Sequence, residues 1–92
     1  MAGTNITTGM NIGEVQALAG EMTRGASEIQ RVLQQISAKL DSTGWVGPDQ
    51  QRFEAEWRGQ RTAQLNQVIQ ALEDAGRIAT QNANEQTQAS NA

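Results

Sequence analysis

The chain has 92 residues and a formal net charge of −3, and it contains no cysteine, histidine or tyrosine. This composition excludes zinc sites built from Cys and His, disulfide frameworks and imidazole general-base catalysis. The seven Lys and Arg residues are scattered, which argues against binding to nucleic acid or an anionic membrane surface. Because so short a chain has only a small core and no covalent or metal cross-link, we expect a partner chain.

The N-terminal residues 1–10 mix Gly, Thr and Asn with isolated apolar residues, which predicts a flexible arm. They include neither a basic leader nor an apolar segment, so we expect no cleavable signal peptide. No apolar run is long enough to predict stable membrane insertion. If the protein is secreted, we expect the chain itself to carry the export signal from the cytoplasm.

A first helix is predicted from about residue 12 to 41, where apolar residues recur at steps of three and four. Gly20 and Gly25 lie inside it, and each costs about 1 kcal/mol relative to alanine. Either another backbone approaches the helix closely at Gly25, or both glycines are tolerated because the helix is long and packed along its length. The apolar residues form a stripe along one side of this predicted helix, and Leu33 and Leu40 widen it. The residues of the stripe are Val15, Leu18, Met22, Ile29, Val32 and Ile36.

A turn is predicted at residues 42–47, followed by a second helix from 48 to 79. Pro48 suits the first helical position because its φ is fixed and it has no N–H, and Gly47 can cap the helix before it. Apolar residues then recur at steps of three, four and eight, on Phe53, Trp57, Leu65, Val68, Leu72, Ala75 and Ala79, with Ile69 and Ile78 beside them.

The fold class predicted is all-α: an antiparallel helix-turn-helix hairpin in a single domain, residues 11–80, followed by a flexible polar tail, residues 81–92. A stripe wider than one helix–helix contact leaves apolar side chains exposed, so we expect two hairpins to dimerise into a four-helix bundle. The residues expected in the dimer or hairpin seam are Leu18, Met22, Ile29, Val32, Ile36, Leu65, Val68 and Leu72.

No catalytic, metal or cofactor site is predicted, and we expect a non-enzymatic protein. The serines have no histidine to act as a base, and neighbouring carboxylates such as Glu54 and Glu56 do not share a helix face. The informative segment is the turn, where Trp45 precedes Gly47, with Phe53 and Trp57 as aromatic contacts in the second helix. Trp45 either closes the end of the bundle or is recognised by a partner.

The Trp45-Val46-Gly47 turn, in an acidic and cysteine-free chain of two helices, resembles the WXG family of small type VII (ESX) secretion proteins, which includes early secreted antigen-like proteins. Phe53 agrees with the aromatic at the start of that family's second helix, and the resemblance spans about residues 11–80. It implies a homodimer, or a heterodimer with a related WXG-type protein, exported without a cleaved signal by a membrane ATPase-driven type VII secretion system.

Two functions are therefore expected. The first is a secreted protein, or an escort of another substrate, that acts by protein–protein binding; the alternative is a non-exported helical-hairpin adaptor. The family's export signal, a Tyr followed four residues later by Asp or Glu, has no counterpart, and Ala79 and Ala83 occupy those places. Either a partner chain supplies the export signal, or the secretion system recognises this chain differently, or this chain is not itself the exported one.

Overall fold

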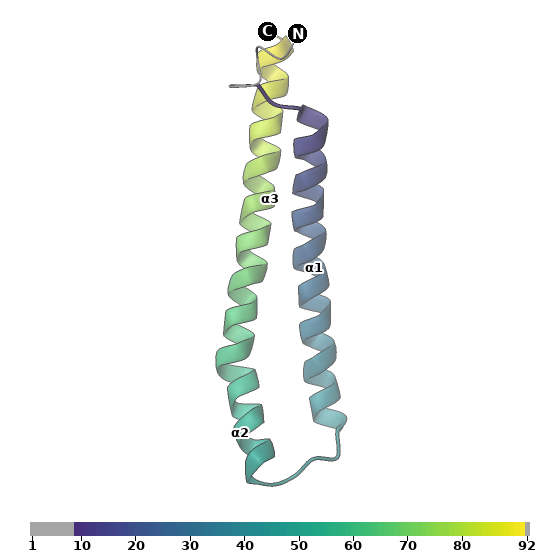
Figure 1. Cartoon of the computed structure of the whole chain (residues 1–92), viewed down its shortest axis with the longest axis vertical. Helices are drawn as coiled ribbons and strands as arrows, with labels where there is room; N and C mark the ends of the chain where they lie inside the picture. Colours follow the sequence, from purple (N-terminus) through teal and green to yellow (C-terminus); the bar gives the residue numbers. More distant parts are fainter. Residues whose placement is uncertain (1–8, 92) are drawn as a thin grey trace.

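The computed structural model describes residues 9–91 and is an elongated helical hairpin of 66 × 20 × 18 Å. Its elements are α1 (Ile12–Ser42), α2 (Pro48–Glu56), the π-helix η2 (Trp57–Arg61) and α3 (Thr62–Asn91). The first helix runs antiparallel to the other three elements, which together form one continuous rod (Figure 1). The described residues are therefore all-α, and the expected arm at residues 1–10 lies mostly outside them.

The α1 helix begins and ends where side chains satisfy the free backbone groups of its termini. The Asn11 side chain accepts a hydrogen bond of 3.0 Å from the Glu14 N–H, which caps the N-terminus. At the other end, Thr43 Oγ1 donates to the Lys39 carbonyl at 2.6 Å. The predicted bounds, 12–41, therefore differ from the observed helix by one residue.

The connection between the helices turns at Gly47, which has a φ of 124°. Only glycine adopts this backbone conformation without strain, and Pro48 then starts α2 at its first helical position. The Gln51 N–H donates to the Gly47 carbonyl at 3.1 Å, so the helical bonding begins immediately after the turn. The start of the second helix at Pro48 is confirmed.

The π-helix η2 accommodates one extra residue in the rod. Residues half-buried or buried toward α1 recur at steps of three and four on both sides of it, but Trp57 and Thr62 are five residues apart. Thr62 Oγ1 donates to the Trp57 carbonyl at 2.5 Å, which satisfies a backbone group in the widened turn. The eight-residue step from Trp57 to Leu65 is thus absorbed while both side chains face α1.

The seam between the two long helices repeats every seven residues. Its most buried positions are 19, 26 and 33 in α1 and 69, 76 and 83 in α3, a heptad spacing typical of left-handed helix packing. Ala26, Leu33 and Ile69 form the buried cluster, and Ile29, Trp57, Leu65 and Leu72 pack against it. The seam is thus thick near the turn, and alanine and glycine make it thin near the termini.

The α3 helix runs to Asn91, well past the predicted end at Ala79. Ala83 is completely buried, so the expectation of a flexible polar tail from residue 81 onward is wrong. A small side chain fits here because the helices approach closely, and Thr87 Oγ1 donates to the Ala83 carbonyl at 2.9 Å within the helix. In Figure 1 the last turns of α3 extend beyond the start of α1.

Candidate interaction surface

The two open sides of the hairpin differ in polarity. The buried residues of α1 are Ala19, Ala26 and Leu33. The residues just before them are Leu18, Gly25 and Val32. The residues four after them are Thr23, Gln30 and Ser37. In an antiparallel helix pair, the positions just before the buried residues of both helices lie on one side of the seam. The positions four after the buried residues lie on the other side. One side of the seam is therefore apolar on α1 and the other side is polar.

The apolar side continues onto α3, where Val68 and Ala75 occupy the equivalent flanking position and Ile78 lies at its outer edge. We call this surface the apolar face, defined by the exposed side chains of Leu18, Val32, Ile36, Val68 and Ile78. Large apolar residues aligned along one side of an elongated molecule are the usual mark of a protein-binding surface.

The eight residues predicted in the dimer or hairpin seam divide into two groups in the structure. Met22, Ile29, Leu65 and Leu72 are half-buried within the hairpin, whereas Leu18, Val32, Ile36 and Val68 remain exposed on the apolar face. Sequence reasoning left the buried Leu33 and Ile69 beside the stripes and missed Ala19, Ala26 and Ala83. An exact seven-residue repeat of these positions was the signal that could have located them.

A groove lies on the apolar face near the turn, with a volume of about 230 Å³. Val32 and Ile36 form its α1 wall, Trp57 and Leu65 form the opposite wall, and Glu28 stands at its edge. The Trp57 indole N–H donates to Ser37 Oγ at 3.0 Å, so its polar atom is satisfied while its ring lines the groove. The groove suits an aliphatic side chain of a partner.

The turn carries a second apolar feature at the end of the hairpin. The Trp45 ring packs on Phe53 with centroids 5.4 Å apart and planes at 49°, and both side chains remain partly exposed. Val46, between Trp45 and Gly47, is 91% exposed. The Trp-x-Gly segment therefore forms an ordered apolar tip, in which Trp45 contacts α2 and leaves one surface free.

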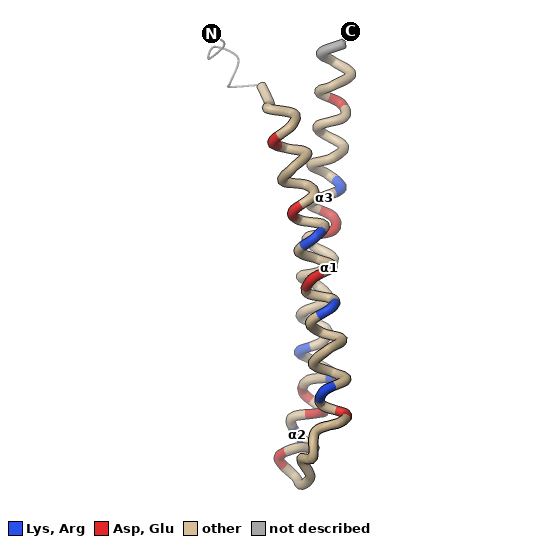
Figure 2. The backbone as a smooth tube through the Cα atoms, turned by 90° about the vertical axis from the view of Figure 1, so that its right-hand side faces the viewer, with Lys and Arg blue, Asp and Glu red and all other residues tan. Residues whose placement is uncertain are grey.

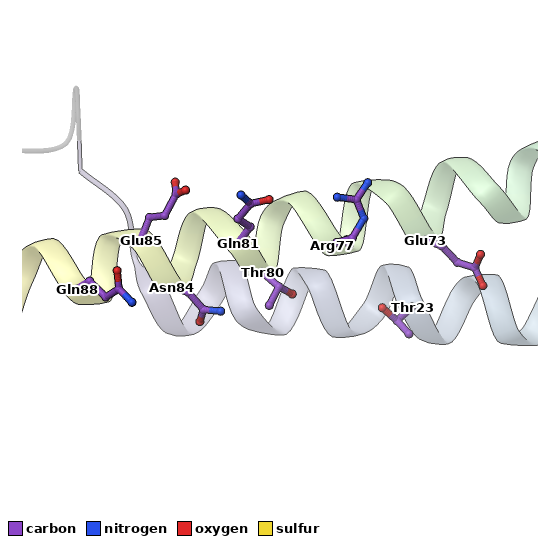
Figure 3. Close-up of a pocket in the computed structure, with 9 residues that line it drawn as sticks. Thr23, Glu73, Arg77, Thr80, Gln81, Asn84, Glu85 and Gln88 are labelled. Carbon is purple, nitrogen blue, oxygen red and sulfur yellow. The ribbon is translucent and has the colours of Figure 1, made fainter.

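The polar face has a shallow depression near the termini, shown in Figure 3. Thr23 of α1 lies across from Glu73 and Thr80 of α3, and Gly76 also lines the depression. The other side chains around it are Arg77, Gln81, Asn84, Glu85 and Gln88. Because these side chains are polar and open to water, we expect this side of the molecule to remain in contact with solvent.

Acidic and basic residues are interspersed along the hairpin (Figure 2), and their side chains pair mostly within one helix. Arg58 is an exception, since it pairs with Asp41 across the turn as well as with Glu54. A hydrogen bond from Arg31 lowers the pKa of Glu28, and hydrogen bonds from Gln50 and Arg58 lower the pKa of Glu54. These shifts belong to exposed ion pairs and do not indicate an acid–base site.

Ala79 and Ala83, which stand where a WXG-type export signal would place its tyrosine and carboxylate, lie in the hairpin seam. Ala79 is half-buried and Ala83 has no exposed surface.

Among residues 9–91, no group of His, Cys, Asp and Glu could hold a metal ion, and no helix is long and apolar enough to cross a bilayer. Neither a protein-family model, nor a curated protein, nor a solved structure matches the chain.

Proposed function

We propose that this chain is a non-enzymatic protein-binding component of a type VII (ESX-like) secretion system. It is either secreted or escorts another substrate, and it acts by pairing its hairpin with a second one in a four-helix bundle. The observation that carries the proposal is the apolar face, whose large side chains a second hairpin would remove from water. Covering a side chain such as Leu18 contributes about 1 to 2 kcal/mol.

The ordered tip supports the secretion half of the proposal. Gly47 has a conformation that other residues adopt only with strain, and it fixes the turn in which Trp45 packs on Phe53. The tip is separate from the apolar residues of the seam, so it can be recognised by the export machinery while the bundle stays assembled. The resemblance of Trp45-Val46-Gly47 to the WXG turn supports a membrane-bound secretion ATPase as that machinery.

A secretion assay tests the proposal. The chain is expressed in its source bacterium and in a strain that lacks the secretion ATPase, and the culture medium is assayed with a cytosolic enzyme as the lysis marker. We expect the chain in the medium of the first strain only. A pool confined to the cells in both strains, with a candidate partner co-expressed, contradicts export and favours the hairpin adaptor.

Substitution in the tip sharpens this assay. Trp45→Ala removes the ring that packs on Phe53 and leaves the seam intact, so we expect less protein in the medium with unchanged helicity. Val46→Ala is the matched control, because Val46 lies in the same turn and is almost fully exposed. Equal export of both variants would contradict a role for the tryptophan in recognition.

A further inference from the structure

We propose that the hairpin opens from its termini in one cooperative step, while the half next to the turn stays closed. The terminal half comprises residues 12–25 of α1 and 73–91 of α3, and the turn half comprises residues 26–42 and 57–72. The inference goes beyond the proposed function, because it concerns the hairpin itself and holds equally for a chain that is never exported. Three observations on the described residues support it.

The first observation is how little apolar surface α3 buries in the terminal half. In the turn half, the residues that pack toward α1 include Leu65, Ile69 and Leu72, together with Trp57 of η2. Beyond Leu72, every buried or half-buried residue of α3 up to Thr87 is alanine, glycine or polar. The stabilisation gained by burial scales with the apolar area removed from water, so the terminal half is held together by the weaker packing.

The second observation is where the glycines of the two long helices lie. The α1 helix contains Gly13, Gly20 and Gly25, and α3 contains Gly76, and all four belong to the terminal half. Glycine destabilises a helix more than any residue except proline, because its unfolded backbone has the greatest freedom. The turn half of α1 and residues 62–72 of α3 contain none. A terminal half that loses its packing therefore also loses helical structure easily.

The third observation is that polar contacts between the two sides of the hairpin lie in the turn half. The Trp57 indole N–H donates to Ser37 Oγ at 3.0 Å, and Arg58 pairs with Asp41. In the part of the chain that the structure describes, the side-chain hydrogen bonds and ion pairs of the terminal half join residues on the same side of the hairpin. The turn joins the helices at one end (Figure 1), so contacts near the termini close a longer loop and cost more conformational entropy.

Opening at the termini separates the ends of α1 and α3 and leaves the rest of the molecule in place. The seam comes apart as far as Gly25 and Leu72, where a Cβ atom at position 25 would stand 3.7 Å from the Leu72 side chain. The contact of Trp45 with Phe53 and the hydrogen bond of Trp57 lie outside the terminal half and remain. A protein that binds either end of the chain can thus draw α1 away from α3 while the tip keeps its structure.

Native-state hydrogen exchange of the purified full chain, resolved by NMR, tests the inference. We expect the amides of residues 16–25 and 76–87 to exchange roughly thirtyfold faster than those of residues 29–40 and 65–72, after correction for their intrinsic rates. The change should occur as one step between the two halves of each helix. Equal protection of both halves, or a gradual decline limited to the last turn of each helix, would overturn the inference.

A disulfide across the terminal half tests the same opening within one molecule. A Cβ atom at position 76 would stand 3.6 Å from the Met22 Cβ, within the range that disulfides span, and the chain contains no cysteine of its own. In the oxidised variant with Met22→Cys and Gly76→Cys, we expect the amides of the terminal half to exchange as slowly as those of the turn half. The reduced variant is the control, because it has the same substitutions and the same crowding without the bond. Equally fast exchange in both forms would contradict the opening.

Charged substitutions test which half opens. We expect Ala83→Asp, which places a carboxylate in the buried seam, to remove part of the helical circular dichroism signal while the Trp57 indole N–H resonance stays in place. Leu33→Asp should remove both signals, because Leu33 is buried in the turn half. Asn82→Asp is the control for Ala83→Asp, since Asn82 is its exposed neighbour. A displaced Trp57 resonance in Ala83→Asp would show that the hairpin opens as a single unit and would overturn the inference.

Discussion

Gly76 of α3 lies directly against the backbone of Ala19 in α1. A Cβ atom at position 76 would stand 3.2 Å from the Ala19 carbonyl oxygen and 3.0 Å from Thr23 Oγ1. These distances are shorter than ordinary contacts, so glycine sets how closely the helices approach near the termini. Gly25, where the sequence suggested a close approach, has only an ordinary contact of 3.7 Å with the Leu72 side chain.

We predict that Gly76→Leu lowers the free energy of unfolding by about 2 kcal/mol, because the added side chain pushes the helices apart. Gly20→Leu is the matched control: it lies in the partner helix, and its nearest neighbour is the flexible Arg24 guanidinium at 3.6 Å. Thermal and urea unfolding followed by circular dichroism at equal chain concentration measures both. A similar loss in the two variants would argue against the close approach at Gly76.

Deletion variants test the role of the π-helix in maintaining the phase of the rod. Removing Gly59 leaves seven residues from Trp57 to Leu65, so a regular α-helix keeps both facing α1. We predict that this deletion keeps the hairpin folded, with a midpoint of thermal unfolding close to that of the full chain. Deleting Gln67 instead should lower the midpoint sharply, because Trp57 and Leu65 then rotate away from the seam. Equal midpoints would show that the phase does not matter.

The bounds of α1, the connection and the start of α2 are predictable from the sequence because local signals mark them. Asn11 caps α1, and Gly47 followed by Pro48 begins α2. The hairpin then follows from the short connection between two amphipathic segments. The π-helix is visible only as an eight-residue step from Trp57 to Leu65, and such a step does not tell where the extra residue is accommodated.

The division between the seam and the apolar face was not predictable, because large apolar residues lie on both. Leu18 and Met22 belong to one stripe in the sequence, but only Met22 turns toward α3. The closest packing uses alanine, which carries little hydrophobic signal, so the burial of Ala83 and the extent of α3 were missed. The helix end was placed by the loss of large side chains, although small ones suffice where the helices are close.

The hydrogen bond between Trp57 Nε1 and Ser37 Oγ gives a further prediction. Ser37→Ala removes the acceptor from a half-buried indole, and we expect the free energy of unfolding to fall by about 1 kcal/mol. The indole N–H resonance of Trp57 should shift in the NMR spectrum, while that of Trp45 stays in place. Ser42→Ala is the control, since Ser42 Oγ donates only to the exposed Lys39 carbonyl at 3.2 Å. An unshifted Trp57 resonance would contradict the bond.

The environment of Glu54 gives a prediction for pH. Hydrogen bonds from Gln50 and then Arg58 lower the pKa of Glu54 in the folded chain. The stabilisation is therefore present above the ordinary glutamate pKa and is lost as the pH falls through the folded pKa. We expect Gln50→Ala to raise the pKa of Glu54, measured by NMR titration of its carboxyl carbon, and to leave the pKa of Glu28 unchanged. An unchanged Glu54 titration would argue against the Gln50 contact.

The molar mass of the purified chain, measured by light scattering together with its helical content, tests most directly whether the apolar face binds a second hairpin. We predict a strongly helical species with twice the 9.9 kDa mass of one chain. A stable, fully helical monomer at every concentration would contradict the account, because the side chains of the apolar face would then remain in water without loss of the fold.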